Sequence, residues 1–363
     1  MTRKMSDPTK WEVPSNADEL SAFVHRGREV NGYDLSGLDL RGAKLCGGVF
    51  NKAKLSGAQL DGADLREASF IGCALDGATL AGANLHAVNL AKCDLSGANL
   101  SGAELTQTKF YEVDVSGVDF RNADARLTVF GKSKLSNALF NQAKLERTIY
   151  LEVELDGVDF RGSKLDSVTL IKSDVRETLF EGASFHRVML IESNLSGMSF
   201  VGAALSYTQF TDALLEGCDF SGADLRNSNF KGAKLAGAVL ARANAANALF
   251  VEADLRGVDL REAKLSQSIF VDAELEGCNF AGAGMYQCVL HRAKCAKASF
   301  TSANLIYADF SEADIREADF TAAKMFRAKL HNVVDSGALI PNRAVTLGTD
   351  PELAAAQNWK PKF

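Results

Sequence analysis

Ala63-Asp64-Leu65-Arg66-Glu67 and Ala223-Asp224-Leu225-Arg226-Asn227 are two copies of the five-residue unit that decides this fold. The unit repeats without insertion over residues 33–332, so every residue whose number is a multiple of five from Leu35 to Leu330 occupies the same place, its centre. Of these 60 centres, 32 are Leu and 19 are Phe, and the small residue two places earlier is Ala in 32 units. Such regularity indicates a single repeat structure rather than two or three globular domains.

A period of five fits neither an α-helix nor a flat strand, because side chains recur on one side about every 3.6 positions in a helix and about every second position in a strand. It does fit a chain that turns a corner at each unit. The centre and the small residue lie two apart, so both point inward from an extended segment. The residues beside the centre, commonly Asp, Asn, Lys, Ser and Arg, then point outward. The pattern therefore predicts a coil filled by Leu and Phe.

The distribution of Phe and Gly indicates how many units make one coil. Eighteen of the 19 Phe centres have numbers that are multiples of ten, and Phe185 is the exception. Alternate faces therefore differ, which requires an even number of faces. Two places after the centre, Gly fills 11 of 15 positions in the series that starts at Gly37, and nine of 15 in the series from Gly42. The Gly pattern recurs at every fourth unit, which predicts four faces per coil.

Charge alternates along the same four-unit step in the column Lys92, Glu112, Lys132, Glu152, Lys172 and Glu192. Stacked neighbours of opposite charge favour strand pairing. Sixty units then make about 15 coils, and a spacing of about 4.8 Å gives a length of roughly 70 Å. Two corners should be Gly-type turns with positive φ, and the other two should use a different turn.

The segments outside the repeat predict helical end caps. Residues 1–32 form a polar tail and a helix that Asn16 and Glu19 cap and Gly27 ends. Its apolar face, with Leu20, Phe23 and Val24, is expected to cover the first coil. Residues 33–332 are the repeat.

Residues 333–363 form a C-terminal cap or tail. Val333–Ile340 can continue one apolar edge as far as Pro341. The capping-box signal Thr349-Asp-Pro-Glu352 predicts a short helix with Trp359 that closes the C-terminal end. The alternative is a docking tail, because so short a helix is marginal without packing.

The composition indicates a cytoplasmic protein. The net charge is −6, no run of 18 apolar residues is present, and the first residues lack an apolar signal-peptide core. Neither a membrane nor direct nucleic-acid binding is expected.

Six of the seven Cys occupy inward positions and predict small core residues: Cys73, Cys93, Cys218, Cys278, Cys288 and Cys295. Cys73 and Cys93 would stack within disulfide range, but two reduced thiols are favoured in a reducing compartment.

No pattern for catalysis, cofactor binding or metal binding emerges from the sequence. The five His are far apart in coil number or face, and His291 and His331 share a column but lie two coils apart. We expect them to be exposed single histidines. No nucleophile stands beside a base, and the interior has no room for a pocket. The sequence therefore predicts a non-enzyme without cofactors.

One outer face is unusually apolar, the face whose centres run from Phe50 and Phe70 to Leu330. Branched residues favour flat strands, which is one interpretation. The other, which we favour, is a contiguous strip that binds another protein or a second copy of the chain. A smaller patch contains Tyr286, Ile306, Tyr307 and Phe326. The candidate partner-binding residues of the strip are Val129, Ile149, Leu151, Ile171, Met189, Ile191, Leu249, Val251, Ile269, Val271 and Val289.

The repeated A-[DN]-L-x-x pattern resembles the pentapeptide-repeat family over about 300 of the 363 residues. This resemblance implies an all-β fold, a right-handed quadrilateral parallel β-helix with short helical end caps. The opening segment, residues 30–45, is similar to that of long bacterial pentapeptide-repeat proteins associated with type VI secretion. That similarity implies a non-catalytic protein-binding scaffold or adaptor.

The alternative from the same family is a DNA mimic that binds gyrase and affects quinolone susceptibility. The uninterrupted repeat register resembles these members. Against it, the charge of −6 is spread along a long repeat, and Lys is frequent on the surface. Duplex DNA carries about one negative charge per 1.7 Å.

Overall fold

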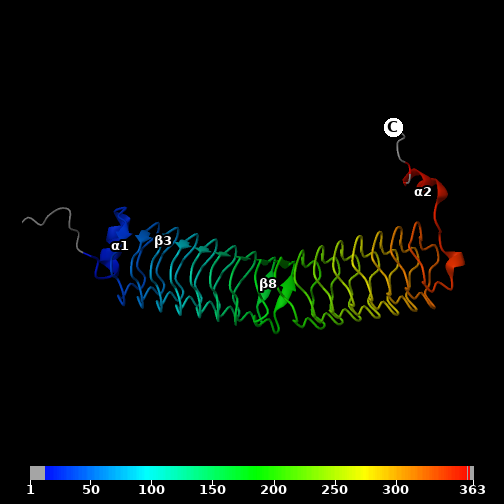
Figure 1. Ribbon diagram of the computed structural model, residues 1–363. Helices are drawn as coiled ribbons and strands as arrows, with labels where there is room; N and C mark the ends of the chain where they lie inside the picture. The colour runs from blue at the N-terminus through cyan, green and yellow to red at the C-terminus, as the bar shows by residue number, and fades with distance from the viewer. Residues whose placement is uncertain (1–12, 358, 360–363) are drawn as a thin grey trace, which may run out of the picture. The chain divides into compact units, whose positions relative to one another are not determined.

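A computed structural model describes residues 13–357 and 359. They divide into two compact units: unit 1 is 13–168 with 177–184, and unit 2 is 169–176 with 185–357 and 359. Each unit is a parallel β-solenoid (Figure 1). The elements are α1 (Ala17–His25), β1 (Val30–Asn31), β2 (Val49–Asn51), β3 (Ser69–Ile71), β4 (Asn89–Ala91), β5 (Lys109–Tyr111), β6 (Val129–Gly131), β7 (Ile149–Leu151), β8 (Lys164–Asp166), β9 (Thr169–Ile171), β10 (Ser184–His186), β11 (Met189–Ile191), the 3₁₀-helix η1 (Arg343–Val345) and α2 (Pro351–Gln357).

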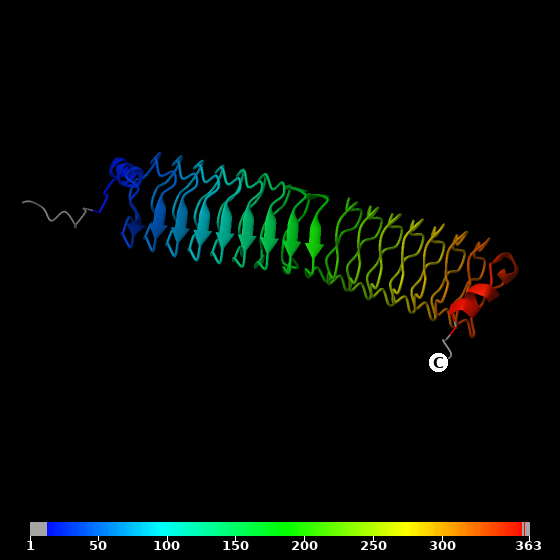
Figure 2. The ribbon, with the colours of Figure 1, turned by 90° about the horizontal axis from the view of Figure 1, so that it is seen from above.

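Parallel pairing between residues four units apart confirms the predicted coil of four five-residue faces. In unit 1, one ladder runs through each face, as in Asp34↔Lys54, Asp39↔Gln59 and Lys44↔Asp64. The fourth face carries the regular strands, and Phe50 pairs with Phe70 where β2 meets β3. Strands β2 to β7 lie side by side in this ladder (Figure 2). Unit 2 keeps the same four-unit step.

The predicted run of about 15 coils is divided between two compact units. At four units per coil, the repeat residues 33–168 of unit 1 correspond to about seven coils, and 185–332 of unit 2 also to about seven. The two units interleave in sequence: 169–176 belongs to unit 2, whereas the later segment 177–184 belongs to unit 1. The five-residue register continues through this division without a break, and Phe185, the one Phe centre whose number is not a multiple of ten, lies at its edge.

Leu and Phe centres fill the interior of both units, as the pattern predicts. All centres are buried except Phe180 and Phe185, which are partly exposed. Rings stack within a column, as between Phe50 and Phe70 with centroids 4.4 Å apart and planes at 7°. Rings of neighbouring columns meet edge to face, as between Phe110 and Phe120 at 88°. Aromatic pairs of both geometries add stability beyond their buried area.

The corners differ from the prediction, because all four carry a residue with positive φ. Gly37 and Gly42 have φ values of 66° and 65°, but Lys52 and Glu67 also have values of 50° and 59°. One corner of unit 1 is still distinct. Most corners are closed by a bond such as Leu38 N–H to Leu35 O at 3.3 Å, and no such bond follows the centres Phe50 to Tyr150 of the stranded face in the described part of unit 1.

Helix α1 covers the N-terminal end of unit 1, as predicted. The Asn16 side chain accepts a hydrogen bond from Glu19 N–H at 3.0 Å. The Glu19 carboxylate accepts from the backbone of Ser15 rather than of Asn16, so the capping box is displaced by one residue. Leu20, Phe23 and Val24 are buried, and the Phe23 ring packs edge to face on Tyr33. The first coil is therefore shielded from water.

The C-terminal end differs from a helical cap. The ladder continues past 332 through Val334, Leu339 and Leu347, so the apolar edge extends further than expected. Helix α2 is capped by Asp350 and has no buried residue. Leu353 and Trp359 are 48% and 72% exposed. The expectation that this helix closes the end is therefore wrong.

Helix α2 instead contacts the side of unit 2 through polar groups. The Gln357 amide oxygen lies 2.9 Å from His331 Nε2, and the amide nitrogen donates to Glu312 at 2.8 Å. Asp350 N–H donates to His331 Nδ1 at 3.1 Å. His331 is only 5% exposed, which corrects its prediction as an exposed histidine.

Left-handed corners occupied by Ala provide a test of backbone strain. Ala87 has a φ of 57°, which costs an L-residue about 1 kcal/mol. We expect Ala87→Gly to raise the free energy of unfolding by about 1 kcal/mol, because Gly carries no such penalty. Ala81 lies one corner earlier and does not have a positive φ. Ala81→Gly should therefore lower the free energy of unfolding by a similar amount. Urea unfolding followed by circular dichroism measures both, and equal effects of the two changes would contradict the explanation.

The Tyr150 hydroxyl provides a test of interior packing. The side chain is fully buried in a Phe column, stacked on Phe130 with centroids 5.2 Å apart. Its hydroxyl has no hydrogen-bond partner among the described residues, and such a buried group costs about 1–3 kcal/mol. We expect Tyr150→Phe to stabilise the protein by about 1 kcal/mol, and Phe130→Tyr to destabilise it. A lower unfolding midpoint for Tyr150→Phe would show that the hydroxyl is satisfied.

Candidate protein-binding surface

The predicted apolar strip lies on the stranded face, but its residues are distributed over both units. Val129, Ile149 and Leu151 belong to unit 1, and the other eight candidates to unit 2. Ile149 and Leu249 are each 37% exposed, and the remaining candidates are half-buried. Neighbouring strands at about 4.8 Å cover part of each side chain, so only the outer tips reach solvent.

In unit 1 the register joins the apolar side chains into one surface. On the outward row of β3 to β7, Ile71 pairs with Ala91, Ala91 with Tyr111, Tyr111 with Gly131 and Gly131 with Leu151. Five successive coils therefore present no charged or amide side chain in this row. The outward row on the other side of the centres contributes Val129 and Ile149, which pair with each other. We call this surface the unit 1 patch: Ile71, Ala91, Tyr111, Val129, Gly131, Ile149 and Leu151.

Two of the most exposed residues of the patch were missed by sequence reasoning. Ile71 and Tyr111 are 47% and 46% exposed, more than any predicted candidate. They follow the centres Phe70 and Phe110 directly, as Leu151 follows Tyr150, so the same repeat position could have found them. An added Cβ at Gly131 would lie 3.2 Å from the Tyr111 ring, which shows that this ring lies over the glycine.

In unit 2 the predicted contiguous strip is interrupted. Ile171 pairs with Ile191 where β9 meets β11. The next outward positions hold Gln209, Thr211, Asn229 and Lys231. Apolar residues resume with Leu249, which is bridged to Ile269, and Ile269 to Val289. The strip is therefore two separate patches in this unit, because two polar coils intervene.

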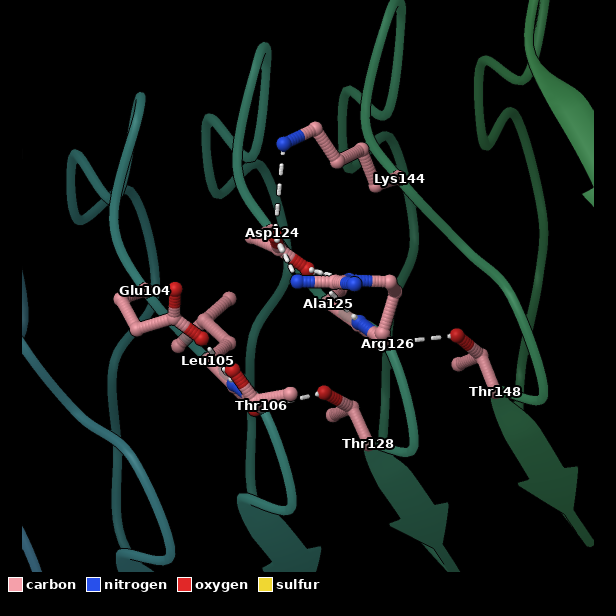
Figure 3. Close-up of polar contacts among 9 residues, drawn as sticks. All are labelled: Glu104, Leu105, Thr106, Asp124, Ala125, Arg126, Thr128, Lys144 and Thr148. Carbon is pink, nitrogen blue, oxygen red and sulfur yellow. Dashed lines mark hydrogen bonds and ion pairs between the residues drawn. The ribbon is translucent and has the colours of Figure 1, made fainter.

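A ladder of buried threonines positions the strands of the unit 1 patch. The Thr108, Thr128 and Thr148 hydroxyls occupy the small-residue position before β5, β6 and β7. They donate to the carbonyl oxygens of Leu85, Leu105 and Ala125 at 2.6, 2.8 and 2.8 Å. Figure 3 shows the last two of these threonines at the starts of their strands. Each bond fixes the corner that leads into an outward-facing strand.

Outside the patch, charged residues largely neutralise one another. The Lys/Glu column that borders it forms Lys92–Glu112 and Lys132–Glu152 pairs at 3.8 and 3.9 Å, as the alternation predicts. Elsewhere an Asp before a centre pairs with the Arg after it. Among the described residues, ten pairs are of this kind: Asp39–Arg41, Asp64–Arg66, Asp119–Arg121, Asp124–Arg126, Asp159–Arg161, Asp174–Arg176, Asp224–Arg226, Asp254–Arg256, Asp259–Arg261 and Asp314–Arg316.

The geometry of these pairs is bidentate. Arg126 donates to both oxygens of Asp124 at 2.7 and 2.8 Å, and Lys144 of the next coil approaches the same carboxylate at 3.4 Å (Figure 3). In the Asp119–Arg121 pair, hydrogen bonds from the guanidinium hold the pKa of Asp119 below its ordinary value. Exposed pairs contribute little stability. Their main consequence is that the carboxylates are already matched by cations.

Within residues 13–357 and 359, no group of three or more His, Cys, Asp or Glu is placed to hold a metal ion. The six inward cysteines are buried free thiols, including Cys73 and Cys93. No helix in the described part of the chain is long and apolar enough to cross a membrane.

Four-faced parallel coils with Leu or Phe centres define a β-solenoid protein. Family models agree: pentapeptide repeat models match residues 43–120 and 165–240, and further copies match 233–332. Together they cover more than half of the 363 residues. The chain belongs to the pentapeptide-repeat family.

The chain is also similar to solved structures, among them HetL, which is described as a pentapeptide repeat protein. A trypsin-treated form of QnrB1, a plasmid-mediated fluoroquinolone resistance protein, is 25% identical, with 50% of this chain and 89% of that chain covered and a TM-score of 0.32. HetL from the cyanobacterium Nostoc, involved in heterocyst differentiation regulation, is 19% identical, with coverage of 92% and 94% and a TM-score of 0.23. No curated protein sequence gives a significant match.

Proposed function

We propose that this pentapeptide-repeat protein is a non-catalytic scaffold that binds another protein, or a second copy of itself, through the unit 1 patch. The observation that carries the proposal is the unbroken apolar row from Ile71 to Leu151 in five paired coils, with Tyr111 46% exposed. Tyr is enriched where protein interfaces bind most tightly. Contiguous apolar surface of this kind is uncommon on a monomer without a partner.

The rigidity of the backbone supports a scaffold role. Every strand of the patch is hydrogen-bonded to its neighbours, and the threonine ladder fixes the preceding corners. A surface that is already ordered loses little conformational entropy on binding. The opposite face offers a contrast, because Asp119–Arg121 and Asp159–Arg161 make it polar and charge-matched.

The charge distribution favours a protein partner over mimicry of DNA. A duplex mimic needs dense negative charge. The ten Asp–Arg pairs cancel charge instead of accumulating it, as at Asp159, whose carboxylate is 2.7 Å from Arg161. Gyrase binding through mimicry of DNA is therefore the second candidate function. A gyrase supercoiling assay discriminates between this function and the scaffold. A role in bacterial type VI secretion is a narrower form of the scaffold proposal.

Replacing the most exposed apolar tips tests the proposal. We expect the triple variant Ile71→Ser, Tyr111→Ser and Leu151→Ser to fold, because its inward residues are unchanged. It should lose at least tenfold in affinity for the partner captured by the wild-type chain, or lose self-association. Sedimentation velocity and binding to the purified partner measure these effects.

The matched control places three changes on the same outward row of the opposite face: Asp61→Ser, Arg121→Ser and Asn141→Ser. It should retain wild-type association. Identical behaviour of the patch variant and the wild type would reduce the patch to a consequence of strand propensity. Gyrase inhibition at low micromolar protein that survives the patch substitutions would favour the second candidate.

A further inference from the structure

Three aromatic rings lie exposed on another face of unit 2, on successive coils. Tyr286, Tyr307 and Phe326 are 37%, 42% and 53% exposed. Tyr286 and Tyr307 pack edge to face with centroids 5.9 Å apart, and Tyr307 and Phe326 do so at 6.0 Å. Ile306 precedes Tyr307 on the same corner and is half-buried. We call these four residues the aromatic ridge. Large apolar tips that remain exposed in this number indicate a binding surface.

The charge around the ridge is one-sided. Its face has 12 outward positions between 264 and 327, and none of them is Asp or Glu. Three are cations: Lys264, Lys324 and Arg327. On the same face two coils earlier, Arg226 is paired with Asp224 at 2.6 Å. On this face, the four coils that carry the ridge therefore lack the carboxylates that neutralise Arg226 earlier on the same face.

These three cations have no ion-pair partner among the described residues. On the face that follows, the Asp309 carboxylate pairs with Lys329 at 3.1 Å. Exposed cations beside apolar groups attract carboxylates and set the orientation of a bound chain. The ridge is therefore complementary to a segment that combines apolar anchors with acidic flanks.

We propose that the aromatic ridge of unit 2 binds an acidic segment of a partner protein, whose apolar side chains pack on Tyr307 and Phe326 and whose carboxylates pair with Lys324 and Arg327. The surface lies in unit 2 and does not depend on the unit 1 patch. The Tyr and Phe side chains of the ridge and the adjacent Arg327 are of types that are enriched at protein interfaces.

The arrangement of the rings favours a peptide over single-stranded nucleic acid. Bases bind by stacking on open ring faces along a basic groove. Here the edges of neighbouring rings cover part of the faces, with interplanar angles of 88° and 77°. The aliphatic Ile306 also lies within the ridge.

Selection of displayed random dodecapeptides on the full chain tests the proposal. We expect the selected peptides to carry net negative charge and at least one Phe, Leu or Trp. Fluorescein-labelled copies should bind with an affinity that falls as salt rises, because carboxylate–cation attraction is screened. Fluorescence anisotropy gives the dissociation constants.

Two variants and one control assign the binding to the ridge. Tyr307→Asn with Phe326→Ser should weaken binding of these peptides at least tenfold, and Lys324→Glu with Arg327→Glu should do so and reduce the salt dependence. Asn suits position 307, where φ is 59°. Tyr207→Asn is the matched control, because Tyr207 is 53% exposed at the same repeat position, with a φ of 62°. It should change binding less than twofold.

Three results would overturn the proposal. Selected peptides could be neutral or basic, or they could bind both variants as tightly as the wild type. Alternatively, a labelled oligothymidylate of similar length could bind the ridge more tightly than the peptides, which would assign it to nucleic acid. All substituted side chains lie on the outer surface, so each variant should keep the coil intact. Circular dichroism of each variant verifies this.

Discussion

Backbone hydrogen bonds between successive coils are the constraint on which the rest of the structure depends. The N–H of a buried centre donates to a carbonyl oxygen of the next coil, as from Leu35 to Lys54 at 2.7 Å and from Leu205 to Asp224 at 2.8 Å. One inserted residue would exchange inward and outward side chains in every later unit. No insertion interrupts the register between 33 and 332. At the C-terminal end the step changes, because Lys329 is bridged to Leu347 rather than to residue 349.

The same constraint sets the composition of the interior. Side chains of one column are separated by about one strand spacing, so planar rings stack within a column and meet the next column edge to face. Phe120 and Phe140 stack at 4.6 Å, and Phe130 meets Phe140 at 88°. The Phe centres at alternate faces in the sequence result from this packing of rings. A residue whose shape fits but whose chemistry does not, such as Tyr150 with its unpartnered hydroxyl, is accommodated at a cost in stability.

The inward pattern made the fold predictable, whereas features without an inward residue were predicted less well. The faces, the four-unit step and helix α1 followed from Leu, Phe and the apolar side of 17–25. The conformation of the corners did not follow from the sequence. Gly marks only the corners at which a left-handed φ causes no strain, whereas Lys52 adopts a left-handed φ of 50° although it is not Gly. Helix α2 was expected to cap an apolar end, but its contacts run through the polar Gln357. The division into two units leaves no trace in the period.

The outward positions are almost free of the fold's requirements, and this makes their departures from the average informative. A typical outward pair is neutral and polar, as Asp259 and Arg261 are at 2.7 Å. The stranded face between Ile71 and Leu151 replaces such pairs with apolar tips, and the ridge around Tyr307 replaces their acids with rings. Neither change is needed for pairing between coils, because Gln, Asn and Ser occupy equivalent positions elsewhere without altering the register. Exposed apolar area without a structural purpose carries a cost in solubility, and its concentration on these two surfaces is the observation from which both proposed binding roles are argued.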